Sequence, residues 1–182
     1  MNRPIPMASL ISTPGVGFDQ PFEMLEACHE RVARMLALLQ RLRGHLPAHG
    51  ADANAQQAAR DVMRYFDMAA PHHHRDEELH VFPPLLARGD REMLALVARL
   101  QQDHVQMEAR WQQARQVLAA VASGALQALS ANDEAALEAF AVLYDGHIEA
   151  EERLAYPAAA ALLDAPALAG MGQEMARRRG AA

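Results

Sequence analysis

Two stretches decide the fold: HHRDEELHVFP at residues 73–83 and HIEAEERLAYP at residues 147–157. Aligned without a gap, they share a histidine, a pair of adjacent glutamates, an aromatic residue and a proline. In each, the histidine precedes a glutamate by four residues, giving the pairs His73–Glu77 and His147–Glu151. Residues four apart lie on the same face of a helix. The repeat therefore predicts two equivalent helices, each presenting an imidazole and a carboxylate to one side.

A second, weaker repeat links the remaining helical stretches, because LEACH at residues 25–29 corresponds to LQQDH at residues 100–104. The chain thus reads as two similar helical hairpins. A pseudo-twofold arrangement of these would bring His29 and His104 towards the same point as the two histidine–glutamate pairs. A preference of helix ends for glutamate and proline would account for similar segments, but not for four matched histidines. We infer one shared site rather than separate surface pairs.

Apolar residues at helical spacing, together with start and stop signals, divide the chain into four long helices. We expect them at about 21–44, 52–87, 91–123 and 130–163, with a short helix after Pro166. Long helices joined by short loops favour an all-α fold, an antiparallel up-down four-helix bundle. The expected organisation is an N-terminal extension (1–18), the bundle (19–163) and a C-terminal tail or short helix (164–182).

Composition and charge narrow the class of protein. The 182 residues fit one domain, and the net charge of −6, with scattered arginines, argues against a nucleic-acid partner. No apolar run approaches the ~20 residues that span a bilayer. Prolines also interrupt the opening residues, unlike a signal peptide. We therefore expect a soluble, cytoplasmic protein without a membrane partner. The single cysteine, Cys28, excludes an internal disulfide and an all-thiolate metal site.

The predicted ligands suit a pair of metal ions. Four imidazoles and two carboxylates give each ion two nitrogen ligands and leave both glutamates free to bridge. Two carboxylates and a bridging oxide or hydroxide largely offset the charge of two divalent ions. This mixed set, with positions left open, favours two iron ions, with manganese as an alternative, over structural zinc, which prefers a closed tetrahedral site. Open positions on ferrous ions would take dioxygen or nitric oxide.

Three consecutive histidines, 72–74, each precede an acidic residue by four positions. The second run selects the middle one, His73, as the ligand. His72 and His74 would point about 100° away on the helix, and we interpret them as solvated or supporting residues.

Three further residues have two interpretations each. His80 lies on the face of His73 but corresponds to Leu154, so it is a pocket residue or a reserve ligand. Tyr144, three residues before His147, either hydrogen-bonds a ligand or packs at the core edge. For Cys28 a buried, inert thiol is favoured over a redox role.

These motifs resemble the bacterial hemerythrin-like, or HHE cation-binding, domain. The resemblance rests on the His-His-x-x-Glu-Glu-x-x-x-Phe-Pro run, on the His-x-x-x-Glu-Glu run and on the two single histidines, and it covers roughly residues 19–179. It implies a hemerythrin-like bundle with two bridging glutamates. The iron ligands that it implies are His29, His73, Glu77, His104, His147 and Glu151.

The resemblance also has limits. Animal oxygen carriers of the wider superfamily use a His-x-x-x-His pair on the third helix, whereas Glu108 stands four residues after His104 here. Simple oxygen storage is therefore not implied, and Glu108 is a minor candidate ligand. Iron-cluster repair proteins of the superfamily add a cysteine-bearing N-terminal domain, but only about eighteen residues precede the first helix. Ferritin-like bundles use Glu-x-x-His instead.

Three functions fit this site. The favoured one is a binding protein that takes up or senses dioxygen, nitric oxide or iron. The alternatives are a di-iron enzyme that reduces dioxygen, peroxide or nitric oxide, and an iron reservoir or donor. A homodimer is compatible with the alanine-rich fourth helix and the tail.

Overall fold

The computed structural model describes residues 16–181, and every regular element in that range is a helix. Most of the predicted N-terminal extension, residues 1–15, lies outside the described residues. The all-α class is confirmed. In chain order the elements are α1 (Pro21–His49), α2 (Ala53–Asp76), the π turn η2 (Glu77–Val81), α3 (Phe82–Arg88), α4 (Arg91–Ala122), α5 (Ala131–Ala141), α6 (Leu143–Ala150), the π turn η3 (Glu151–Ala155), α7 (Tyr156–Ala160) and α8 (Ala165–Arg178).

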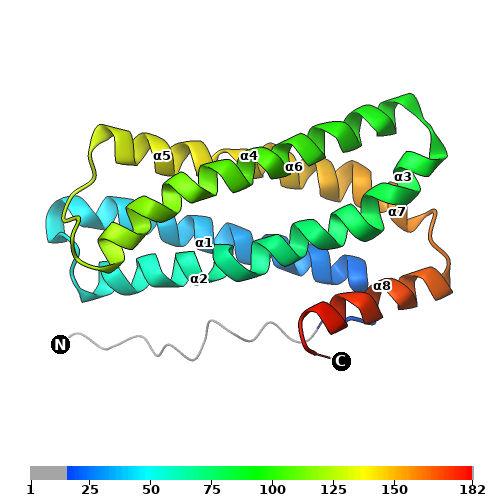
Figure 1. The fold of residues 1–182 in the computed structure, drawn as a ribbon, viewed down its shortest axis with the longest axis horizontal. Coiled ribbons are helices and arrows are strands. Elements are labelled where there is room, and N and C mark those ends of the chain that lie inside the picture. The colour runs from blue at the N-terminus through cyan, green and yellow to red at the C-terminus, as the bar shows by residue number, and fades with distance from the viewer. Residues whose placement is uncertain (1–15, 182) are drawn as a thin grey trace.

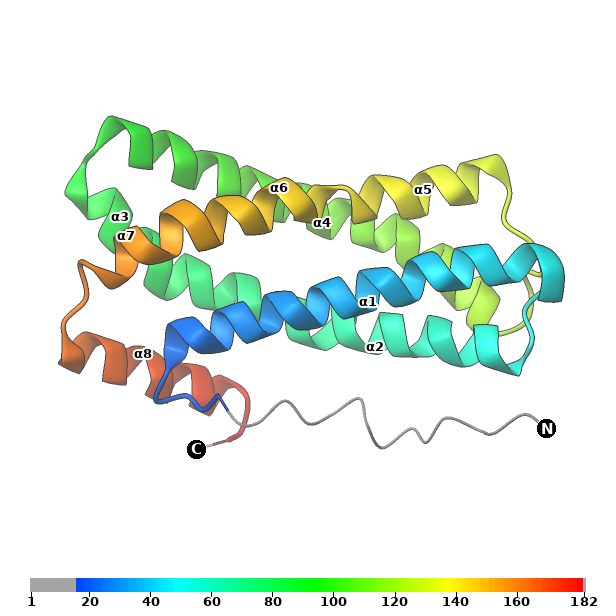
Figure 2. The same ribbon diagram turned by 180° about the vertical axis from the view of Figure 1, so that it is seen from behind.

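Four long helical segments lie side by side along one axis, each running back beside the one before it (Figure 1). They consist of α1, of α2 with η2 and α3, of α4, and of α5 and α6 with η3 and α7. The helix α8 lies alongside one end of these segments, next to the start of α1 (Figure 2). The second and fourth segments are not uninterrupted helices, because each contains a π turn and the fourth is also broken at Val142.

Side-chain caps begin α2, α4 and α5. Asp52 accepts a backbone hydrogen bond of 2.8 Å at the start of α2, and Asp90 accepts one of 3.0 Å at the start of α4. Ser130 and Asp133 form a capping box before α5. Each satisfies backbone N–H groups that the first helical turn leaves unpaired.

The first helix is longer than the sequence predicts. The expected end at Gly44 is wrong, because α1 continues to His49. Its C-cap is Gly50, whose φ of 62° lies in the left-handed region. An interior glycine costs a helix only about 1 kcal/mol, and burying Leu42 and Leu46 on either side of Gly44 offsets that cost. The capping glycine is therefore Gly50.

Each of the two π turns lies just before a proline of the repeat. Pro83 and Pro157 lack an amide hydrogen, and a proline ring inside a helix clashes with the carbonyl four residues earlier. Those carbonyls belong to Leu79 and Arg153, which lie within η2 and η3. The backbone widens there, and Phe82 N–H bonds to the carbonyl five residues back. The matched prolines of the repeat thus mark a local change of helix type rather than a helix end.

The core consists of two apolar clusters with a polar layer between them. In each long segment a buried histidine separates residues of one cluster from residues of the other. The first cluster includes Val32, Ala70, Met107 and Tyr144, and the second includes Leu25, Val81, Leu100 and Ala150. Among the described residues, no helix is long and apolar enough to cross a membrane.

Candidate metal centre

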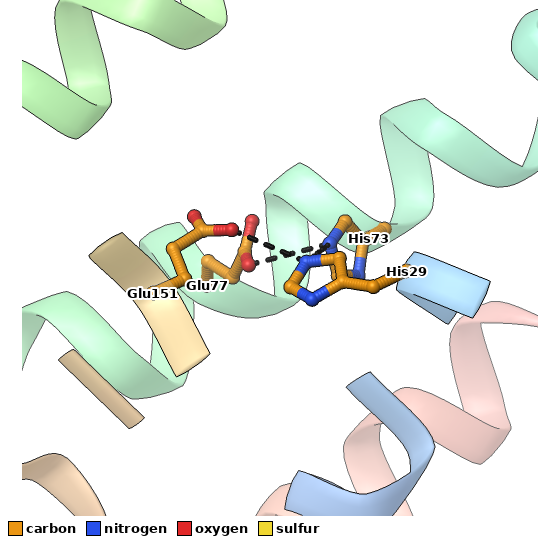
Figure 3. A group of neighbouring side chains, drawn as sticks. All are labelled: His29, His73, Glu77 and Glu151. Carbon is orange, nitrogen blue, oxygen red and sulfur yellow. Dashed lines mark hydrogen bonds and ion pairs between the residues drawn. The ribbon is translucent and has the colours of Figure 1, made fainter. Parts of the chain in front are cut away.

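The polar layer contains all six residues that the sequence selects. One histidine comes from each of α1, α2, α4 and α6, and the first residue of each π turn is a glutamate. Two groups, which share the glutamates, have ligand atoms within 4.8 Å of one another. The first is His29, His73, Glu77 and Glu151, shown in Figure 3, and the second is Glu77, His104, His147 and Glu151.

All four imidazoles direct Nε2 into the site. The Nε2 atoms of His29 and His73 are 2.9 Å apart, and those of His104 and His147 are 3.2 Å apart. Two nitrogens in such a pair can share at most one proton. Both glutamates are fully buried, and their oxygens lie close to these nitrogens, with Glu151 Oε1 2.9 Å from His147 Nε2. The lone pairs of several groups therefore converge on two small volumes.

Three of the four histidines are held from outside by a carboxylate. His29 Nδ1 lies 2.9 Å from Glu152, His104 Nδ1 3.2 Å from Glu78, and His147 Nδ1 3.3 Å from Asp103. An N–H that donates to a carboxylate fixes the tautomer, so that Nε2 keeps its lone pair. This carboxylate–histidine arrangement is the one found around metal-binding histidines.

The carboxylates are left with unused acceptors. In the described part of the chain, Glu77 Oε2 and both side-chain oxygens of Glu151 are buried and accept no well-aligned hydrogen bond, although imidazole nitrogens lie 2.9–3.7 Å away. Each unpaired buried acceptor costs about 1–3 kcal/mol, and more when it is charged. A bound cation would remove that cost. The residues present therefore fit metal ions.

Without a cation, protons must balance the two buried carboxylates. Burial and then the neighbouring Glu151 raise the pKa of Glu77 to about 7. Burial alone would raise the pKa of Glu151, but imidazoles, His104 first among them, hold it well below its usual value. Burial would likewise lower the pKa of His104, but the two carboxylates raise it to about 10. Metal binding would displace protons from this cluster.

Several residues whose role the sequence did not decide lie outside the cluster of six histidine and glutamate side chains. His74 stacks on His104 with ring centroids 4.1 Å apart, which makes it a supporting residue. Tyr144 packs against Phe66 and Phe140 in the first apolar cluster. Glu108 is exposed and belongs to neither ligand group.

The surroundings of His80 and Cys28 decide between the two interpretations of each residue. The imidazole of His80 is turned away from the site towards α8, where its Nε2 lies 2.8 Å from Glu174. Cys28 is buried, and burial raises the pKa of its thiol, which favours the inert form.

Sequence reasoning missed one residue of the site, Tyr156. Its buried hydroxyl donates a short hydrogen bond to Glu77 Oε1 and lies 3.2 Å from His29 Nε2. Its ring stacks on His29 at 5.6 Å. The signal was present, because Tyr156 replaces Phe82 in the aligned runs and is the only one of the two with a hydroxyl.

A cavity of about 580 Å³ lies between α2 and α4, passes His74 and reaches the centre at His104. Phe66, Met107 and Trp111 also line it. Its volume is in the range of small-molecule sites, and its wall is largely apolar.

Fold and site together define an all-helical protein with a buried histidine–glutamate centre suited to metal cations. Residues 20–159 match the sequence model of the hemerythrin HHE cation binding domain, and the chain belongs to that family. An uncharacterized protein of Haemophilus influenzae is 41% identical to it over 69 residues. That match spans 38% of this chain and 40% of the relative's length.

Proposed function

We propose that this chain is a non-haem di-iron protein of the hemerythrin type, with the four long segments forming the family's antiparallel bundle. Each of the two ligand groups holds one iron, and the glutamates belong to both. The proposed ligands are His29, His73, Glu77, His104, His147 and Glu151. The observation that carries this proposal is the unpaired state of three buried carboxylate oxygens that face imidazole nitrogens.

The chain's own residues explain how such a centre would be kept intact. Apolar clusters pack above and below the layer, and the outer carboxylates keep three imidazoles in the metal-binding tautomer. Bound iron would supply open coordination positions for a diatomic ligand. We infer that dioxygen or nitric oxide is bound or sensed there. Histidine and carboxylate ligands suit iron, and each ion would have few protein ligands, which leaves positions open for a small molecule.

The cavity beside His104 favours a second candidate, an enzyme that reduces dioxygen, peroxide or nitric oxide. A volume of about 580 Å³ admits molecules much larger than a diatomic ligand, such as an organic reductant. Binding to the cavity wall would bring such a molecule next to an iron ligand.

One experiment separates the two candidates. Protein loaded anaerobically with ferrous iron is mixed with dioxygen or nitric oxide, and its visible spectrum is followed. A stable adduct that reverses when the gas is removed supports the binding protein. Multiple turnover with an added reductant supports the enzyme. Absence of any spectral change with either gas, in protein of verified iron content, would contradict both.

A further inference from the structure

The C-terminal helix α8 contacts the bundle next to the proposed metal centre, although it follows the residues that match the family (20–159). Met171 and Met175 are buried in the second apolar cluster. Gly172 lies against the backbone of Phe18, where a Cβ would approach the carbonyl oxygen to 1.8 Å. Packing therefore holds α8 against both the start of α1 and the end of the bundle (Figure 1).

A buried ion-pair cluster joins α8 to α2. Asp76, the last residue of α2, is fully buried, and its carboxylate accepts hydrogen bonds from both Arg178 and Arg179. The Arg179 bond to Oδ2 is 2.5 Å, and a second one to Oδ1 is 3.2 Å. A buried carboxylate that loses its partners is strongly destabilising. Asp76 can therefore keep this position only while α8 is docked.

A second contact is made within the π turn. Glu174 accepts from Arg178 at 2.6 and 2.7 Å, and one of its oxygens lies 2.8 Å from His80 Nε2. The helix α8 thus contacts the residue before Glu77 and the residue three positions after it. The two contacts hold the backbone on both sides of the glutamate that begins η2.

Within residues 16–181, the other π turn has no equivalent of these contacts. In the aligned runs Asp76 corresponds to Ala150 and His80 to Leu154, whose side chain is 51% exposed. Two of the positions at which residues 73–83 depart from the repeat, 76 and 80, are thus positions at which α8 attaches. Asp76 and His80 belong to neither ligand group, so metal binding does not account for a carboxylate and an imidazole at these two positions.

We propose that α8 is a latch that positions Glu77 in the metal centre and slows the release of metal. Asp76 and His80 are positioning residues that act through the backbone of η2. The inference rests on the metal site proposed above. Removing the latch would loosen one of the two glutamates without altering any ligand.

Three consecutive arginines at the C-terminal end of α8, residues 177–179, provide a matched test. Arg178→Ala/Arg179→Ala removes the partners of Asp76, whereas Arg177→Ala changes a neighbour that bonds only to a backbone carbonyl of its own helix. Asp76→Ala removes the buried charge itself and reproduces the residue of the second run, so it serves if the double variant does not fold. Leu118→Ala, in the first apolar cluster, controls for a general loss of stability.

Full-length protein is loaded with Co²⁺, its metal content is measured, and release to an excess of chelator is timed after far-ultraviolet circular dichroism has shown that each variant is folded. We expect release to be about 10- to 100-fold faster in the latch variants, as for other residues that hold metal ligands in place. The visible Co²⁺ spectrum should change with the ligand geometry. Arg177→Ala and Leu118→Ala should release metal and absorb as the wild type does.

Equal release rates and spectra in Arg177→Ala and in the folded latch variants would overturn the latch while leaving the metal site intact. Faster release in Leu118→Ala to the same extent would also overturn it, because general instability would then suffice. A wild-type protein that binds no Co²⁺ and no Fe²⁺ would instead overturn the metal site, and the latch with it.

Discussion

At the scale of single residues, Glu77 and Glu151 differ from the histidines in belonging to both ligand groups. Each is fully buried and starts a π turn. Such turns are frequent at functional sites. The loss of either carboxylate would therefore affect both metal positions, whereas the loss of one imidazole would affect one.

Replacing Glu77 or Glu151 by alanine should weaken metal binding by more than the roughly 10- to 100-fold typical of supporting residues. His74→Ala should have a smaller effect, because His74 stacks on His104 without facing the centre. Chelator competition measures both. If His74→Ala lost more metal than His73→Ala, the register assigned to α2 would be wrong.

Tyr156→Phe should lower metal affinity by about 10-fold while leaving the fold intact. The change removes the hydroxyl that donates to Glu77 and keeps the ring, as Phe82 does in the other run. The affinity is measured by chelator titration. Tyr144→Phe is the matched control, because Tyr144 is equally buried but packs in the first apolar cluster. Equal affinities of the two variants would exclude a role for the Tyr156 hydroxyl.

Sequence reasoning could select the six candidate ligands because helical spacing and an internal repeat constrain them jointly. The repeat also chose His73 among three adjacent histidines, and the structure directs that imidazole into the cluster. It could not place Tyr156 at Glu77, because that contact joins residues 79 positions apart and depends on how α7 packs. Metal binding by these residues stays a prediction.

At the scale of elements, caps were predictable and helix types were not. Capping depends on residues about three positions apart, so Asp52 and Ser130 could be predicted as caps from the sequence. Each π turn precedes a proline that would end an isolated helix, and here the helix continues past it. For α1, burial of Leu46 decided the end, and local sequence alone favoured Gly44.

The contact of α8 with His80 should depend on pH. In the folded protein the pKa of Glu174 is lowered from 4.5 to about 2. The hydrogen bond from Arg178 is the main cause, and the one from His80 contributes less. A lowered pKa means that the stabilisation is complete above pH 4.5 and disappears as the pH falls towards 2. The difference in unfolding free energy between wild type and Glu174→Gln, from urea titrations of metal-free protein, should therefore shrink over that range. A difference that stays constant would contradict this origin.

At the scale of the whole molecule, a layer of buried polar groups divides the core. Such a layer is destabilising while its acceptors are unpaired, and it becomes stabilising once they are satisfied. The overall stability should therefore depend on metal more than that of a bundle with a continuous apolar core.

Metal loading should raise the Tm. Free metal at about 100 times its Kd adds about 2.7 kcal/mol per site. For a chain of this size that corresponds to roughly 5–10 °C for each occupied site. Differential scanning calorimetry with and without chelator measures the shift. In Glu77→Ala/Glu151→Ala the shift should vanish, and its persistence would place the stabilising metal elsewhere.

The central claim is that two irons bind in this layer, and the metal content of anaerobically purified, iron-reconstituted protein tests it most directly. Elemental analysis should give about two irons per chain, one for each ligand group, and none in Glu77→Ala/Glu151→Ala. Admitting air to the wild type should produce a new visible charge-transfer band. One zinc per chain, no metal after reconstitution, or an equal iron content in the double variant would contradict the di-iron centre.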